Sequence, residues 1–421
     1  MIAAPTRRHV LAGAAALALA PSARSAHAQT SARVVVIGGG FAGATCARQL
    51  HRAGLKVTLV EPSAAYVSCP FSNAVLGGLR ELKDQTFTYE ALAREGIVIA
   101  QLEAKAIDGN ARRVTLGDGA SLSYDRLVLA PGIDIRFDGL PGYDQAASEV
   151  LPHAWKAGPQ TTLLRRQLES MDDGGTVVIS APNNPFRCPP GPYERASLIA
   201  HYLKTHKPRS KVLILDAKDA FSKQSLFTAA WKELYGEMIE WVGLSAGGKV
   251  TEIDPGSKTF VTEFGKHRAD VGNVIPPQRA GAIAVTSGIA DQTGWCPIDP
   301  VTFEARQHAG IHVIGDAAIA GGMPKSAFSA NAQAKACAQA VTLMLRGETP
   351  PSPKLINTCY SLVAPDYGIS VAGVYQPAKG LLADVAGAGG VSAAKAPASV
   401  RAAEASYAEA WFKTITHDVF G

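Results

Sequence analysis

The pattern of apolar and polar positions near the start of the chain predicts a strand, a turn, a helix and a second strand. β-Branched residues over Ala32–Ile37 predict the first strand, and small residues over Ala42–His51 predict the helix. Between them lies the glycine-rich turn Gly38–Gly43. Apolar residues over Lys56–Val60 predict the second strand, which ends at the acidic residue Glu61. The sequence therefore predicts a βαβ unit of the kind that binds a dinucleotide.

The glycines of this turn have the spacing that holds a diphosphate. Gly38 permits a tight turn, Gly40 lets the backbone approach the pyrophosphate, and Gly43 lets the helix pack closely on the strand. The predicted helix opens at Phe41 and Ala42, so its N–H groups and partial positive charge face the diphosphate. This part of the chain is therefore expected to bind the cofactor.

Further residues decide between FAD and NAD, which share this turn. Glu61 is placed to accept hydrogen bonds from the ribose of the adenosine half. The apolar runs 124–132 and 310–316 resemble the secondary fingerprints of two-dinucleotide-binding-domain flavoproteins, in which the final acid holds a ribityl hydroxyl of FAD. Asp316 takes that role, and a helix N-cap is the alternative for it. The predicted FAD contacts comprise Gly38, Gly40, Phe41, Ala42, Gly43, Glu61, Ala106, Pro131, Gly132 and Asp316.

A second α/β stretch follows, but it has no glycine turn. Strands are predicted over Thr176–Ser180 and Lys211–Asp216, with a helix over Tyr193–Leu203 between them. The connecting loop 181–192 contains five prolines. Because proline has no N–H group, this loop cannot form the same phosphate cradle. The fold is expected to be kept while NAD binding is lost, which disfavours an NAD-linked reductase.

The fold class predicted from this order is α/β, with two Rossmann-like domains arranged as in glutathione reductase and a small C-terminal α+β domain. The expected segments are an export signal (1–28), the FAD-binding domain (29–141 and 279–347), a second Rossmann-like domain without an NAD motif (142–278) and a C-terminal domain near the flavin (348–421). Within the last segment, the Gly/Ala-rich stretch Lys379–Pro397 is expected to be a flexible insertion, and Arg401–Phe412 an amphipathic end.

The N-terminal residues have the form of an export signal. Arg7 and Arg8 precede the apolar run Val10–Ala20, and Ala26-His27-Ala28 reads as a cleavage site. A twin-arginine signal exports folded proteins, so a periplasmic flavoprotein is expected; an ordinary secretory signal with a chance arginine pair is the alternative.

Composition limits the remaining possibilities. The chain has 421 residues, of which 47% are hydrophobic and 18% charged, as in ordinary globular proteins. Removal of the signal lowers the formal net charge from +5 to +2, which is too small to argue for nucleic acid. No apolar run of membrane-spanning length follows the signal. No C-x-x-C-H or C-x-x-C motif occurs, so the chain is expected to carry neither its own c-type haem nor a metal site.

Three of the six cysteines are candidates for chemistry. Cys69 follows the strand that ends at Glu61, so its thiol could form a thioether with the 8α-methyl of a flavin or could be a buried apolar residue. Cys188, in the proline loop, and Cys359 could form a disulfide, either as a structural staple, which pattern alone favours, or as a redox group. Cys46 and Cys337 are interpreted as packing residues, and Cys296 is unassigned.

Several longer segments resemble the flavoprotein subunit of flavocytochrome c sulfide dehydrogenase. They are the Cys69 segment, Leu151–Gly158, Phe186–Ala196, Ile275–Gly281, Met323–Ser326, Asn357–Tyr360 and the pair His417-Asp418, and the match covers nearly the whole chain after the signal. The proline loop and the Asn-Thr-Cys-Tyr run are specific to this family. Pro70-Phe71 departs from some relatives, which could shift flavin packing without removing the thiol.

The resemblance implies FAD attached through an 8α-S-cysteinyl bond to Cys69 and a redox-active Cys188–Cys359 disulfide beside the ring. Glu194 matches an acid proposed as the active-site base; a first-turn carboxylate that stabilises its helix is the alternative. Lys325 is expected to place positive charge near the flavin pyrimidine.

The expected function is sulfide:cytochrome c oxidoreductase. Sulfide, or a polysulfide or persulfide, would open the disulfide, and the electrons would pass through FAD to a c-type cytochrome on a partner chain, which carries the haem. The alternatives are a sulfide:quinone reductase, which needs a membrane-docking end, and a non-catalytic accessory flavoprotein of thiosulfate oxidation that restores oxidised thiols of partner proteins.

Overall fold

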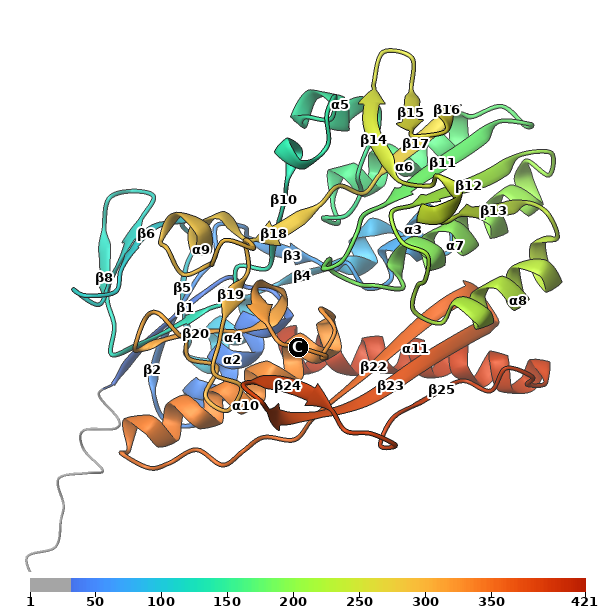
Figure 1. Cartoon of the computed structure of the whole chain (residues 1–421). Coiled ribbons are helices and arrows are strands. Elements are labelled where there is room, and N and C mark those ends of the chain that lie inside the picture. Colours follow the sequence, from blue (N-terminus) through green and yellow to red (C-terminus); the bar gives the residue numbers. More distant parts are fainter. Residues whose placement is uncertain (1–31) are drawn as a thin grey trace, which may run out of the picture.

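The computed structural model describes residues 32–421, so the predicted export signal lies outside the described residues. Two parallel sheets form separate α/β units, and a third unit of antiparallel strands and one long helix lies beside both, in orange and red in Figure 1. The predicted α/β class, with its two Rossmann-like units and a smaller C-terminal unit, is confirmed.

The first unit has a five-stranded parallel sheet in the order β20–β9–β1–β2–β5. Its strands are β1 (Arg33–Ile37), β2 (Lys56–Val60), β5 (Val98–Ala100), β9 (Arg126–Leu129) and β20 (Ile311–Val313). Central strand β1 is buried on both faces, which explains its unbroken run of apolar residues. Because β2 and β9 flank it on opposite sides, a crevice opens at its carboxyl end, where doubly wound sheets bind ligands.

Helices α2 (Phe41–Arg52) and α10 (Ala327–Leu345) pack together beside this sheet. Smaller elements complete the unit: β3 (Ala65–Val67), α3 (Ser72–Leu76), η1 (Leu82–Gln85), β4 (Thr86–Thr88), α4 (Glu90–Glu95), β6 (Ala104–Asp108), β7 (Arg113–Leu116), β8 (Ser121–Ser123), α9 (Ala282–Thr286), β19 (Cys296–Pro297), η4 (Gly315–Ala317) and β21 (Ala318–Ile319). The chain leaves along β10 (Ile133–Ile135) and returns along β18 (Gln278–Ala280), which pair antiparallel.

The second unit has a four-stranded parallel sheet in the order β13–β12–β11–β17. Its elements are η2 (Phe137–Gly139), α5 (Gln145–Val150), α6 (Pro159–Ser170), β11 (Thr176–Ala181), α7 (Gly191–His206), β12 (Lys211–Asp216), α8 (Gln224–Tyr235), β13 (Ile239–Val242), η3 (Leu244–Ala246), β14 (Val250–Asp254), β15 (Thr259–Thr262), β16 (Gly265–Arg268) and β17 (Val271–Val274). The predicted strands and helix of this stretch are confirmed, and α7 begins two residues earlier than expected.

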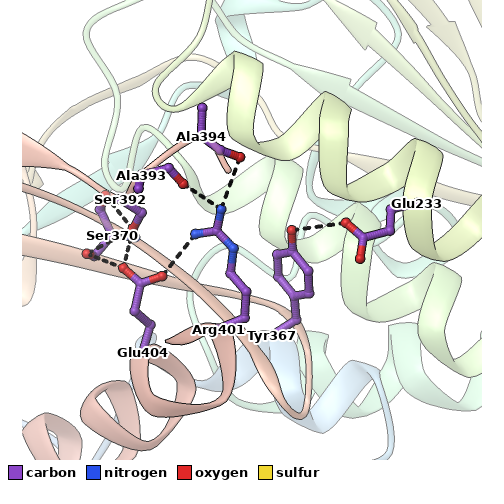
Figure 2. A network of polar contacts seen from close by, with 8 residues as sticks. All are labelled: Glu233, Tyr367, Ser370, Ser392, Ala393, Ala394, Arg401 and Glu404. Atoms are coloured by element: carbon purple, nitrogen blue, oxygen red, sulfur yellow. Dashed lines mark hydrogen bonds and ion pairs between the residues drawn. The ribbon is translucent and has the colours of Figure 1, made fainter. Parts of the chain in front are cut away.

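The third unit pairs the long strands β22 (Leu355–Ala364) and β23 (Tyr367–Ala378), with α11 (Ala398–Phe420) packed on them. The prediction of a flexible insertion over Lys379–Pro397 is wrong, because β24 (Leu381–Asp384) and β25 (Gly390–Val391) both pair with β23. Figure 2 shows how the rest of this segment is held. The buried Arg401 guanidinium pairs with Glu404 at 3.0 Å and donates to the backbone oxygen of Ala393 at 2.7 Å.

The end of α11 also closes onto the first unit. Phe420 stacks on Tyr66 and Phe87, with ring centroids 5.3 and 5.2 Å apart. Arg48 on α2 is 1% exposed and donates to the backbone oxygen of Asp418 at 2.6 Å. Residues separated by about 370 positions in the sequence, Arg48 and Asp418, therefore join the last helix to the first unit.

Among residues 32–421, none of the helices combines the length and the apolar character that a bilayer crossing requires.

Candidate functional site

A cavity opens at the carboxyl end of β1. Its lining extends from the glycine turn through Glu61 and Cys69 to Asp316, so the cavity suits an extended molecule. Most predicted FAD contacts line it: Gly38, Gly40, Phe41, Ala42, Glu61, Cys69, Pro131, Gly132 and Asp316. We call it the cofactor cavity.

The glycine turn has the geometry that the sequence predicted. Gly38 has φ +98°, and a Cβ there would lie 2.3 Å from the Ala130 carbonyl oxygen. A Cβ on Gly43 would lie 1.8 Å from the Gly38 oxygen, so this glycine permits helix and strand to approach and does not line the cavity itself. Gly40 caps α2 without a side chain, which leaves the first turn of the helix facing the cavity.

Two acids and one hydroxyl supply polar groups to the cofactor cavity. Glu61 accepts from the Gly39 N–H at 2.8 Å, and its oxygens retain capacity for ribose hydroxyls. Asp316 lies within η4 rather than at a helix N-cap, so the alternative interpretation is wrong; burial raises the pKa of its carboxyl. The Tyr89 hydroxyl is buried and has no hydrogen-bond partner among residues 32–421, which indicates a polar ligand. These residues fit FAD.

Two predicted FAD contacts lie elsewhere. Ala106 is exposed on β6, in the antiparallel β6–β7–β8 sheet, and does not line the cavity. Lys325 lines neither cavity, because its ammonium donates to the backbone oxygens of Asp316 and Ala318 at 2.6 and 2.9 Å. Burial lowers the pKa of Lys325 to about 8. Its ammonium therefore binds the Asp316 turn, which borders the cofactor cavity, and the placing of positive charge near the flavin pyrimidine stays a prediction.

A second cavity adjoins the first and brings together the three candidate cysteines and Glu194. We call it the sulfur cavity. Aromatic side chains form much of its wall: Phe71, Trp155, Phe328, Tyr360 and Trp411. Cys69 and Arg187 line both cavities, so they stand where the two meet.

Cys188 and Cys359 come to the sulfur cavity from two different units. Cys188 has φ +58°, lies just before α7 and donates its N–H to the Lys325 oxygen at 2.8 Å. Cys359 lies on β22, and its Sγ accepts from the Asn357 amide at 3.2 Å. All six cysteines are free thiols in the structure, so the predicted Cys188–Cys359 disulfide is not formed here. Burial raises the pKa of the Cys188 thiol.

The position of Glu194 is consistent with each of the two interpretations that the sequence left open. It lies in the first turn of α7 and also lines the sulfur cavity. Its carboxylate accepts from the Asn73 amide at 2.8 Å and from the Leu362 N–H at 2.9 Å. Burial is the largest influence and raises the pKa of Glu194. The side chain can therefore hold or release a proton beside the cysteines.

Sequence reasoning missed Arg187 and Lys223. The Arg187 guanidinium donates to the Trp155 backbone oxygen, and one of its nitrogens lies 4.0 Å from a carboxylate oxygen of Asp316. These contacts hold a cation where the two cavities meet. Its position next to Cys188 in the proline loop was a usable signal. Lys223 donates to the Cys359 oxygen, and no local pattern marks it.

In the second unit, the chain's own side chains bind the acid that ends β12. Asp216 ends β12, at the position where an acid holds the ribose in NAD-binding folds. Its carboxylate already accepts from Lys218, Tyr193 and Trp241 at 2.6, 2.6 and 3.0 Å. Tyr193 stacks on Phe221 with centroids 3.6 Å apart. The hydrogen-bonding capacity of the Asp216 carboxylate is therefore used by the chain's own side chains.

Residues 32–421 contain no cluster of side chains suited to a metal ion.

The fold and the two cavities define a flavoprotein of the pyridine nucleotide-disulphide oxidoreductase class, whose family description matches residues 32–171. Two more specific descriptions match: the central region of the sulfide dehydrogenase (flavocytochrome c) flavoprotein chain at 161–276, and the flavin-binding region of flavocytochrome c sulphide dehydrogenase at 351–420. The flavoprotein chain of this dehydrogenase from Chlorobaculum thiosulfatiphilum is 60% identical over 45 residues, which cover 10% of this chain and 94% of that one.

The chain belongs to the family of the flavocytochrome c sulfide dehydrogenase flavoprotein, a family of sulfide-oxidising FAD proteins, and the predicted family is confirmed. The mitochondrial sulfide:quinone oxidoreductase of Mus musculus is also similar, at 24% identity over 340 residues, which cover 75% of this chain and 72% of that one. The structure of sulfide:quinone oxidoreductase from Aquifex aeolicus superposes with a TM-score of 0.68 at 18% identity, covering 93% of this chain and 92% of that one, and supports the fold.

Proposed function

We propose that this chain oxidises sulfide through Cys188 and Cys359, carries FAD on Cys69 and passes electrons to a c-type cytochrome. One observation carries the proposal: Cys69 stands where the cofactor cavity meets the sulfur cavity, and the other two cysteines share the latter with Glu194. A thiol there can hold the cofactor beside a reducible sulfur pair. A periplasmic location, through the twin-arginine signal, belongs to the same proposal.

The residues of the sulfur cavity act first. With Cys188 and Cys359 oxidised to a disulfide, HS⁻ attacks one sulfur. The old S–S bond breaks, a new one forms a persulfide, and its electron pair leaves on the other cysteine as a thiolate. Glu194 takes the proton of the incoming sulfur species. FAD, when bound, accepts two electrons and can release them one at a time. The Arg187 guanidinium stabilises negative charge where the cavities meet.

The acceptor is tested with purified protein, sulfide and no oxygen. We expect electrons to reach a c-type cytochrome much faster than a soluble quinone analogue. Faster quinone reduction would favour a sulfide:quinone reductase. Flavin bleaching by sulfide with transfer to neither acceptor would favour the accessory thiol-redox role instead. No bleaching at all would contradict sulfide oxidation.

Replacing Glu194 with glutamine is expected to slow flavin reduction by sulfide about 10²–10⁴-fold, the usual contribution of a general base. Because burial raises the pKa of Glu194, the wild-type rate falls as pH drops through that raised value and the carboxylate takes up a proton. Glutamine cannot titrate, so this acid limb of the pH profile disappears. Anaerobic stopped-flow absorbance measures both effects.

Glu304→Gln is the matched control, because this half-buried carboxylate also accepts a backbone N–H, from Gly310 at 2.6 Å, yet lines neither cavity. Its rate and pH profile should match those of the wild type. An unchanged acid limb in Glu194→Gln would show that another group takes the proton.

A further inference from the structure

A buried lysine lies behind the strand that carries Cys359. Lys223 precedes α8 and is 9% exposed. Its ammonium donates to the Cys359 backbone oxygen and to the Ser361 hydroxyl, both at 2.8 Å. It therefore reaches across 136 residues of sequence to the two positions of β22 that flank Tyr360.

Three of the four ionisable groups that act most strongly on Lys223 line the sulfur cavity: Cys359, Glu194 and Cys188. Burial lowers its pKa to about 8, and the groups that oppose this, in order of effect, are Cys359, Glu194, Cys188 and Glu404. These groups stand on β22, α7, the loop before α7, and α11. The attraction is mutual, so an ammonium that is favoured by sulfur anions also favours those anions.

The backbone at Lys223 supports a role for its side chain. Its φ of +62° lies in the left-handed region, where glycine or asparagine is preferred. A lysine in this conformation costs free energy, and such residues persist where the surroundings hold them, often at functional sites. Lys207 provides a contrast, because it is also 9% exposed but donates to the backbone oxygens of Glu169 and Met171, which line neither cavity.

We propose that Lys223 is a positioning residue that stabilises negative charge on the sulfur at Cys359, either as a thiolate or as the outer sulfur of a persulfide. The inference rests on the proposed function, since sulfur exchange at Cys359 is the step in which this charge would matter. The Asn357 amide, 3.2 Å from Sγ, assists from the same strand. No redox step belongs to Lys223 itself: it remains an ammonium while the charge on sulfur appears and disappears.

The test uses thiol reactivity in the flavin-loaded protein rather than turnover. In a Cys188→Ser background, Cys359 stays a free thiol, and its alkylation by iodoacetamide is followed by mass spectrometry at a series of pH values. Because only the thiolate reacts, Lys223→Met is expected to lower the rate at pH 7 about tenfold. Lys223→Arg, which keeps the charge, should restore most of the rate. Lys207→Met should leave it unchanged.

An undiminished rate in Lys223→Met, or failure of arginine to restore it, would overturn the proposal. If Lys223→Met does not fold, the order in which the cysteines of the reduced wild-type protein are alkylated tests the proposal instead. There, Cys359 should be alkylated before Cys188, whose pKa is raised by burial, and the reverse order would contradict the role of Lys223. Bleaching of wild-type flavin by sulfide is measured separately, so failure of the proposed function is distinguished from failure of this inference.

Discussion

Cys188→Ser is expected to lower the rate of flavin reduction by sulfide at least about 10³-fold, the scale on which loss of a nucleophilic partner acts. Serine cannot form the sulfur–sulfur bond that HS⁻ attacks. The substitution keeps the backbone bond from the Cys188 N–H to the Lys325 oxygen. It changes no residue of the cofactor cavity, so the flavin should still bind with wild-type absorbance.

Anaerobic stopped-flow absorbance after sulfide addition measures this effect. The matched control is Cys296→Ser, because Cys296 is 0% exposed on β19 and lines neither cavity. Its flavin should bleach at the wild-type rate. Bleaching of Cys188→Ser at that same rate would rule out the disulfide route and would leave direct attack of sulfide on the cofactor.

The second large effect is expected from Cys69→Ser, which should convert tethered FAD into dissociable FAD. Acid precipitation of the wild-type protein is expected to give a yellow pellet, because a thioether survives unfolding. The variant should give a colourless pellet and a yellow supernatant, because the glycine turn, Glu61 and Asp316 still line the cavity and bind FAD without a bond. Intact mass of the two polypeptides should differ by the mass of the cofactor.

Cys46→Ser is the control for this experiment, since Cys46 is buried on α2 and outside both cavities. It should behave as the wild type does. A yellow supernatant from the wild-type protein would contradict the tether. In that case FAD would bind without a covalent bond to Cys69, and sulfide oxidation at Cys188 and Cys359 would use an exchangeable cofactor.

The cofactor cavity could be predicted from sequence because its signals are local. Gly38 and Gly43 stand at positions where a Cβ would collide with backbone oxygens, and nothing but glycine meets that requirement. Asp316 follows a buried strand directly, so its position at the carboxyl end of the sheet follows from the strand itself. The residues alone offered Cys188 and Cys359 as one possible pair, and the family resemblance then implied a redox role for that pair.

Other features depend on contacts that no local pattern encodes. Lys223 meets Cys359 only because α8 packs beside β22. Two carbonyl oxygens within nine residues bind the Lys325 ammonium, and the sequence pattern gave no sign of these contacts. The Gly/Ala-rich composition of 379–397 predicted flexibility, whereas pairing with β23 and the Arg401 contacts hold the segment in place.

The contacts of Arg48 and Phe420 set an order of events during synthesis. The ribosome delivers the glycine turn hundreds of residues before α11, and domains generally fold as their residues emerge, at roughly 5–20 residues per second. Yet Phe420 stacks on Tyr66, which lines the cofactor cavity, and Arg48, on the helix that follows the turn, donates to the backbone of Asp418 near the end of α11. The side of the cofactor cavity formed by Tyr66 therefore gains its packing partner only after residue 420 has left the ribosome, so the first unit depends on the last helix for its final packing.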